Sequence, residues 1–203
     1  MMAMTSTSDS DRVFPARMTP TDLFALFDRW GIAHSTVTHP PLFTVEQGRE
    51  WHPKIPGLHC KNLFLRDDKG RYWLALLPAD KRADLNRLRH RVGAPRFSFG
   101  RAEALLAMMG LTPGSVTPFG LVHDTARHIT VIVDCEIVAT ESVNFHPLHN
   151  AASTTLRSAD LLLFLRELGY TPLVVDCGGS NEERAQDENI SRSAAGAPGR
   201  EAG

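Results

Sequence analysis

The sequence predicts an α+β fold, in which helices flank a single mixed or largely antiparallel sheet. Three observations lead to this class. Residues 59–82, HCKNLFLRDDKGRYWLALLPADKR, contain two apolar runs of strand length joined by a tight turn. Stretches with helical periodicity and capping residues stand between the strands. The order of strands and helices is irregular, whereas a doubly wound sheet requires a regular alternation.

The first half of the chain carries a local signal for each element. Thr19 is expected to cap a helix that begins at Pro20 and ends at Gly31. The other elements expected here are a strand at 35–38, a short helix from Thr44, and strands at 61–67 and 71–77 turned at DDKG.

The second half shows the same mixture of elements. Asp80 is expected to cap one helix, and Ser98 to cap a second helix that runs to Met109 and closes at Gly110. The remaining expected elements are strands at 128–134 (HITVIVD) and 136–140 (EIVAT), a helix over DLLLFLREL capped by Ser158, and a last strand at 172–176 (PLVVD).

The folded body is predicted to be one domain that spans residues 18–177. Residues 1–17 are polar and rich in Ser and Thr, and residues 178–203 lack any apolar periodicity, so both are predicted to be disordered tails. A hydrophobic content of 42% is typical of a globular chain, and a net charge of −1 does not identify a partner.

Cysteine usage and hydropathy predict a cytoplasmic protein. Cys60, Cys135 and Cys177 are an odd number of cysteines without close spacing, which fits a reducing compartment. No apolar run reaches the ~20 residues of a membrane span, and the N-terminus lacks the pattern of a signal peptide. No membrane partner is therefore expected.

Familiar catalytic motifs are absent from the chain. It contains no GxSxG, Walker loop, GxGxxG after a strand or HExxH. His146 and His149 are separated by Pro147, which disfavours a helical ligand pair, so neither a metal nor a cofactor is expected. His59 next to Cys60 suggests a thiol nucleophile, but neighbouring strand residues face opposite ways, and a buried cysteine is the preferred interpretation.

A basic segment follows the second strand of the hairpin. This segment contains only two acidic residues, Asp80 and Asp84. Its seven basic residues are Lys81, Arg82, Arg87, Arg89, Arg91, Arg96 and Arg101. On a helix taken as 81–92, Arg87 and Arg91 would lie opposite the apolar face, one turn apart. A solvated helix face would explain them, but a surface of one sign also complements phosphate.

The loop LTPGSVTPFG, residues 111–120, is a second candidate site. Two glycines and two prolines in ten residues predict a loop of fixed shape, with little side-chain bulk around Gly114. Backbone N–H groups in such a loop can approach a ligand closely. A plain connecting loop would have the same composition, so the loop alone decides nothing.

Four blocks of sequence occur in order: CKNLFLRD, LPADKRADL, TPGSVTPFGLVHD and VNFHPLHN. In this order they resemble the YbaK/prolyl-tRNA-synthetase-associated editing-domain family, and within it the freestanding Ala-tRNA(Pro) deacylases, ProXp-ala or PrdX. The resemblance covers about residues 18–177. It implies a mixed, partly barrel-like sheet with flanking helices, and hydrolysis of the ester that joins a wrong amino acid to the 3′ end of tRNA.

The resemblance also implies roles for individual residues. The lysine of CKN corresponds to Lys61, which would hold the terminal adenosine and the ester and stabilise developing negative charge; an edge-strand lysine that prevents aggregation is the alternative. The GxxxP loop corresponds to Gly114 and Pro118, with Ser115 between them, and would position the 3′ adenosine. The histidine of FHP corresponds to His146, which would orient the substrate unless it only completes a loop.

Further residues are assigned more loosely. Asn62 and Asn144 either donate hydrogen bonds to the substrate or close a backbone turn. Leu42, Phe43 and Val45 are candidates for the walls of a small pocket, although core packing explains them equally well. No side chain is an obvious general base, which agrees with family mechanisms in which a ribose hydroxyl of the substrate helps to activate water.

The expected partner is tRNA(Pro) charged with alanine, with its acceptor stem on Lys81, Arg82, Arg87 and Arg91. Alanine is smaller than proline, and a missing methylene is worth only ~1–3 kcal/mol, so a proline site needs a second sieve. Transient docking to prolyl-tRNA synthetase is left open. Two alternatives stay open: a deacylase of another mischarged tRNA, such as Cys-tRNA(Pro) or a Ser/Thr-charged species, and a non-catalytic aminoacyl-tRNA-binding module.

Overall fold

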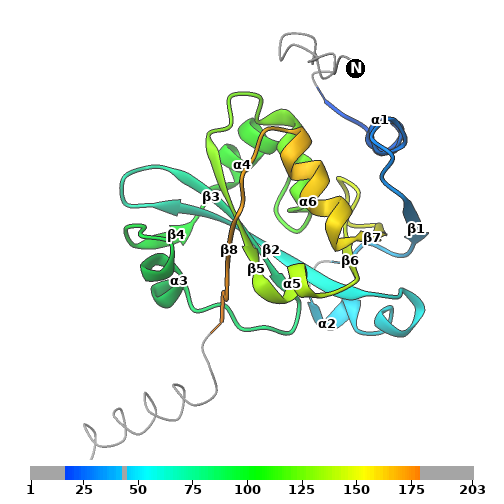
Figure 1. Cartoon of the computed structure of the whole chain (residues 1–203), viewed down its shortest axis with the longest axis horizontal. Helices are drawn as coiled ribbons and strands as arrows, with labels where there is room; N and C mark the ends of the chain where they lie inside the picture. Colours follow the sequence, from blue (N-terminus) through cyan, green and yellow to red (C-terminus); the bar gives the residue numbers. More distant parts are fainter. Residues whose placement is uncertain (1–16, 43–44, 179–203) are drawn as a thin grey trace, which may run out of the picture.

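The computed structural model describes residues 17–42 and 45–178, which form one mixed α+β unit (Figure 1). Only Arg17 and Gly178 of the two expected tails fall within this part of the chain. Phe43 and Thr44 lie outside it.

An eight-stranded sheet runs through the molecule in the order β1-β7-β6-β2-β3-β5-β8, and β4 pairs with β2. Its strands are β1 His34–Thr38, β2 Leu58–Asp67, β3 Tyr72–Pro78, β4 Phe97–Phe99, β5 Ile129–Asp134, β6 Ser142–Phe145, β7 Ala152–Arg157 and β8 Leu173–Val175. The β2–β3 and β6–β7 pairs are antiparallel, whereas β2–β6, β3–β5 and β5–β8 are parallel. The predicted α+β class with a mixed sheet is confirmed.

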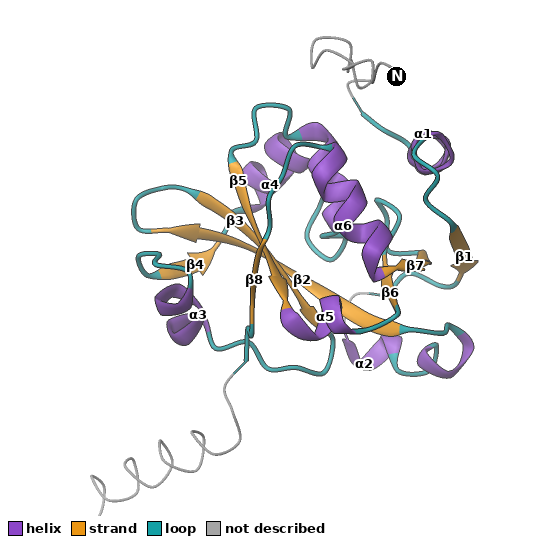
Figure 2. Cartoon of the chain, in the orientation of Figure 1, coloured by secondary structure: helices purple, strands orange, loops and turns teal. Residues whose placement is uncertain are grey.

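Helices cover both faces of this sheet (Figure 2). They are α1 Pro20–Arg29, α2 Val45–Gly48, α3 Leu85–Arg91, α4 Ala102–Met109, α5 Cys135–Ala139 and α6 Ser158–Glu167, with 3-10 helices at η2 His52–Lys54 and η3 Pro118–His123. None of the described helices is long and apolar enough to cross a bilayer.

The central strand β3 divides the core in two because its residues alternate between the faces of the sheet. Leu74 and Leu76 belong to the larger cluster, which includes apolar residues of α1, α4, α6 and η3. Trp73 and Leu77 belong to the smaller cluster, which includes Leu88 of α3. The basic helix α3 therefore covers the face opposite α1 and α6.

Two predicted helix ends are confirmed. The Thr19 hydroxyl accepts from the amide of Asp22 and the Asp22 carboxylate accepts from the amide of Thr19, which completes a capping box. Gly110 closes α4 with φ +67°, in the left-handed region that glycine adopts without strain.

Two predicted caps are wrong. Asp84, rather than Asp80, caps α3 and accepts from the amide of Arg87 at 2.9 Å, so residues 79–82 form a turn instead of a first helical turn. Ser98 lies inside β4, and α4 begins only after Arg101. A later acidic residue, Asp84, replaces Asp80 as the cap, and strand pairing in β4 outweighs the capping signal of Ser98.

The prediction of a strand at 136–140 is also wrong, because this segment forms α5. The buried carboxylate of Asp134 caps this helix by accepting from the amide of Glu136 at 3.0 Å. The strands β6 and β7 were not predicted, since SVNF and ASTTLR carry polar residues where a strand signal needs apolar ones. Asn144, Ser153 and Thr154 of these strands are buried by tertiary pairing; Thr154, for example, hydrogen-bonds to Thr36 of β1.

Candidate active site between β2, β6 and the 114–116 loop

A cavity of about 230 Å³ opens where the first half of β2 meets β6, the turn after β3 and the loop around Gly114. Six of the residues expected in the site line it: Leu42, Lys61, Asn62, Gly114, Asn144 and His146. The sequence did not indicate the other lining residues as site residues: Gly48, Trp51, Ile55, His59, Cys60, Ala79, Val116, Phe145 and Ser153.

Lys61 lies inside a strand rather than at its start. Strand β2 begins at Leu58, and Lys61 pairs with Leu77 of β3. Its Nζ donates to the carbonyl oxygen of Ala79 at 2.7 Å. This bond holds the ammonium group at the wall of the cavity, where its charge can face a ligand.

Asn62 joins β2 to the glycine-containing loop on the other side of the cavity. Its Nδ2 donates to the carbonyl oxygen of Val116 at 2.8 Å. Its Oδ1 is buried and accepts no hydrogen bond from the described residues. A buried acceptor without a partner is destabilising, and a donor on a ligand would satisfy it.

The loop itself has the fixed shape that its composition predicts. Gly114 has φ +86°, a conformation that favours glycine. The amide of Ser115 donates to the carbonyl of Thr112 at 3.0 Å, and Ser115 is buried beside the cavity without lining it. Pro118 is buried as the first residue of η3, so its place is structural.

His146 lines the cavity as a hydrogen-bond acceptor. Its Nδ1 lies 2.8 Å from the carbonyl oxygen of Ala152, so Nδ1 carries the proton and Nε2 is left as the acceptor. Burial lowers the pKa of this imidazole, and the neighbouring His39 and His149 lower it further, whereas the Ala152 bond opposes them. His146 is therefore neutral near physiological pH.

A second histidine, His39, was not predicted to belong to the site. Its Nδ1 donates to the carbonyl of Pro40 at 2.8 Å, so its Nε2 accepts from the hydroxyl of Ser153 at 2.9 Å. Its ring lies 6.0 Å from that of His146. The stretch HPP was the only sequence signal, and it does not indicate a partner 114 residues away.

Asn144 has both ends of its amide occupied. Its Nδ2 donates to Pro56 O at 2.8 Å, and its Oδ1 accepts from the hydroxyl of Thr155. These bonds favour a structural role for Asn144 over direct contact with a substrate.

The walls of the cavity combine apolar and polar residues. Leu42 is fixed to Asn150 by two hydrogen bonds of 3.0 Å, and Trp51 packs against the His39 ring. Phe43 and the Val45 side chain lie outside the described residues, so their place in the walls is not tested. Cys60 is half-buried and lines the cavity, but desolvation raises the pKa of its thiol, which disfavours a thiolate nucleophile.

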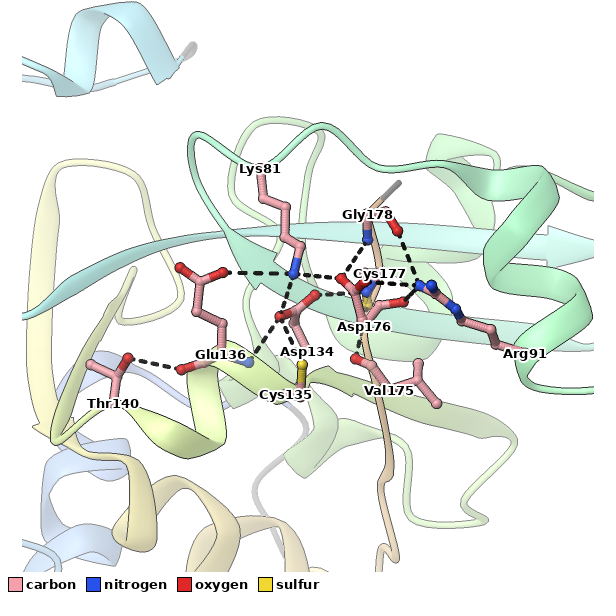
Figure 3. Close-up of polar contacts among 10 residues, drawn as sticks. All are labelled: Lys81, Arg91, Asp134, Cys135, Glu136, Thr140, Val175, Asp176, Cys177 and Gly178. Carbon is pink, nitrogen blue, oxygen red and sulfur yellow. Dashed lines mark hydrogen bonds and ion pairs between the residues drawn. The ribbon is translucent and has the colours of Figure 1, made fainter. Parts of the chain in front are cut away.

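The basic segment divides into two groups. Lys81 and Arg91 form ion pairs with carboxylates of the protein (Figure 3): Lys81 Nζ lies 2.9 Å from Asp134 and 2.6 Å from Asp176, and Arg91 lies 3.2 Å from Asp176. Burial disfavours the charged form of Lys81, but its bonds to Asp176 and Asp134 outweigh this and raise its pKa. These contacts argue against the phosphate-binding role expected for Lys81 and Arg91. Arg82 is exposed and Arg87 half-buried.

The fold and the cavity define a single-domain protein with a small cavity lined by a cationic group, hydrogen-bond acceptors and apolar side chains. The chain belongs to the aminoacyl-tRNA editing domain family, whose model matches residues 39–164, more than half of the chain. The family resemblance carried by the four sequence blocks is thus confirmed.

Relatives with related names support this assignment. The chain is 33% identical over 156 residues to prolyl-tRNA synthetase associated domain-containing protein 1 of Danio rerio, covering 76% of this chain and 85% of that one. It is 31% identical over 150 residues to the prolyl-tRNA editing protein ProX of Acetoanaerobium sticklandii, covering 73% and 92%. A solved structure of a candidate trans-editing enzyme for prolyl-tRNA synthetase matches the fold with a TM-score of 0.62 at 20% identity, covering 83% and 100%.

Proposed function

We propose that this protein is a trans-editing hydrolase that deacylates mischarged tRNA(Pro), with Ala-tRNA(Pro) as its preferred substrate. The observation that carries the proposal is the Lys61 ammonium group, held by Ala79 at the wall of a cavity of about 230 Å³. Membership of the editing-domain family and relatives named for prolyl-tRNA editing support it.

The proposed reaction is hydrolysis of the aminoacyl ester. Water attacks the carbonyl carbon, the bond from that carbon to the ribose oxygen breaks, and a proton from the water passes to the ribose oxygen. Negative charge develops on the carbonyl oxygen, and the Lys61 ammonium group stabilises it. A ribose hydroxyl of the substrate helps to activate the water, as the family resemblance implies.

The neighbouring residues position the substrate. The Nε2 atom of neutral His146 accepts a hydrogen bond from it, and the buried Oδ1 of Asn62 offers a second acceptor. The backbone around Gly114 receives the terminal adenosine, because a glycine there lets a ligand approach closely. Ser115 and Pro118 shape this loop from behind.

The walls explain a preference for alanine over polar amino acids. Leu42, Trp51, Ile55 and Phe145 form the apolar part of the wall, against which a methyl group can pack. Serine and threonine should react more slowly, because Asn62 Oδ1 and His146 Nε2 are taken by the rest of the substrate, and a side-chain hydroxyl is then left without a partner. Proline is excluded because its ring is larger.

For the tRNA itself we assign Arg82, which is exposed, and Arg87, which is half-buried, as the contacts to acceptor-stem phosphates. The charges of Lys81 and Arg91 are already offset by Asp134 and Asp176, so neither is proposed as a contact. A cytoplasmic location and a transient contact with prolyl-tRNA synthetase, which releases the mischarged product, belong to the same proposal.

The test is deacylation of Ala-, Cys-, Ser- and Pro-charged tRNA(Pro), measured side by side with the full chain. We expect Ala-tRNA(Pro) to be hydrolysed fastest and Pro-tRNA(Pro) to survive. Faster hydrolysis of the Cys- or Ser-charged tRNA would reassign the substrate. Binding of all four without hydrolysis would show a non-catalytic aminoacyl-tRNA-binding module instead.

A further inference from the structure

The carbonyl group that holds Lys61 belongs to a turn with anchors of its own. Ala79 follows the last residue of β3, and its amide donates to the carbonyl of His59 at 2.8 Å. The turn closes with a bond of 3.1 Å from the amide of Lys81 to the carbonyl of Pro78. The position of the Lys61 amine therefore depends on where this turn is held.

Lys81 fastens the turn to two other elements of the sheet (Figure 3). Its Nζ reaches Asp134 at the end of β5 and Asp176 just after β8, with Glu136 further away at 3.6 Å. Asp134 is itself fixed, because it is fully buried and accepts from the amides of Glu136 and Cys177.

The chain after β8 packs closely against the Lys81 side chain. A Cβ atom at Gly178 would lie 2.8 Å from Cε of Lys81, so a larger residue there would require the lysine to shift. The amide of Gly178 donates to Asp176 at 3.0 Å, and Gly178 also bridges to Ala83.

Asp176 joins the same anchor to the basic helix. It pairs with Arg91, and the Arg91 guanidinium also donates to the Asp176 and Gly178 carbonyl groups. A single carboxylate thus connects the turn that carries Ala79 with the C-terminal end of α3.

We propose that Lys81 and Asp176 are positioning residues, which hold the turn after β3 so that the Ala79 carbonyl keeps the Lys61 amine in its reactive place. The kinetic part of this inference rests on the proposed deacylase function, whereas the structural part does not. The competing view is that the ion pairs contribute only to the stability of the fold.

The structural part is tested by amide hydrogen exchange in the full chain. Asp176→Asn keeps the shape of the side chain and leaves Lys81 paired with Asp134, so folding should survive. We expect exchange at Ala79 to rise roughly tenfold relative to a core amide such as Leu74. The matched control is Asp160→Asn, which removes the Arg157–Asp160 pair at the start of α6. An equal change at Ala79 in both variants, or none in either, would overturn the proposal.

The kinetic part uses a double-mutant cycle with Lys61→Ala on Ala-tRNA(Pro). Asp176→Asn alone should lower kcat roughly tenfold with KM little changed, because the amine is misplaced. In the Lys61→Ala background it should cause no further loss, since its effect passes through Lys61. An equal loss of kcat in both backgrounds would show that the Lys81–Asp176 pair contributes only to the stability of the fold. If the wild-type protein hydrolyses none of the charged tRNAs, the proposed function fails, and hydrogen exchange still decides whether the turn is held as we propose.

Discussion

The Nδ2 atom of Asn62 donates a hydrogen bond of 2.8 Å to the carbonyl oxygen of Val116, 54 residues along the chain. This bond connects the strand that carries Lys61 with the loop that carries Gly114. The two parts of the proposed site, one for the ester and one for the terminal adenosine, are thereby held at a fixed separation.

Replacing Asn62 with Ala should loosen this connection. Loss of one neutral hydrogen bond costs ~1 kcal/mol of stability, but deacylation should fall further, with kcat/KM reduced at least tenfold (~1.4 kcal/mol). Asn86→Ala is the control, because Asn86 is exposed and bonds only to Arg89 among the contacts of its side chain given by the structure. Equal kinetics for both variants would remove Asn62 from the site.

The sequence predicts the apolar strands of the sheet better than the polar ones. The β2–β3 hairpin was predicted because apolar residues run through both strands and DDKG turns them. The strands β6 and β7 were not, since residues such as Thr154 are polar and become buried only after pairing with distant strands. At α5, the isoleucine and valine of EIVAT favoured a strand, but the Asp134 cap determines a helix.

The site residues also divide into those that the sequence indicates and those that depend on tertiary pairing. Lys61, Gly114 and His146 follow from sequence blocks, and the structure brings them to one cavity. The His39–Ser153 contact could not be predicted, because the pairing of β1 with β7 creates it. The basic residues were predicted as one surface, yet Lys81 and Arg91 pair with carboxylates that lie far away in sequence.

Gly114→Ala should impair the substrate loop. The φ of +86° at this position strains any residue with a Cβ atom, at ~1 kcal/mol or more. Gly31→Ala is the matched control: Gly31 has φ +67°, and a Cβ atom there would meet nothing within 4 Å. Thermal unfolding should show similar losses of stability for both variants, whereas KM for Ala-tRNA(Pro) should rise only for Gly114→Ala. An unchanged KM would show that the loop is only a connection.

His146 should make the protein less stable in acid. Its pKa in the folded state is lowered from the ordinary value of 6.5, so the unfolded chain binds the proton more readily. The contribution of the neutral imidazole is fully present above pH 6.5 and is lost as pH falls through the lowered folded pKa. Chemical unfolding of His146→Gln between pH 7 and pH 5 should show a weaker decline in stability than the wild type. The exposed His90→Gln variant should decline as the wild type does; a parallel decline in His146→Gln would contradict the assignment.

Arg82 and Arg87 should contribute to tRNA affinity without affecting the chemical step. Replacing both with Ala should lower the slope of log affinity against log salt by roughly 0.7–0.9 for each lost phosphate contact. The rate at saturating substrate should change little, because these side chains do not line the cavity. Arg29→Ala on α1 serves as the control, since α1 and α3 pack on opposite faces of the sheet. A slope equal to that of the wild type would leave α3 as a solvated face.

The central claim is that the Lys61 ammonium group stabilises the transition state of ester hydrolysis. Its most direct test is single-turnover deacylation of Ala-tRNA(Pro) at saturating enzyme, comparing the wild type with Lys61→Ala and with Lys69→Ala. Lys69 is an exposed lysine in the turn of the same hairpin, so it controls for loss of charge. The account predicts at least a tenfold lower rate for Lys61→Ala, equivalent to ~1.4 kcal/mol, with its unfolding temperature close to that of the wild type and Lys69→Ala unaffected. A folded Lys61→Ala variant with the wild-type rate would contradict the account.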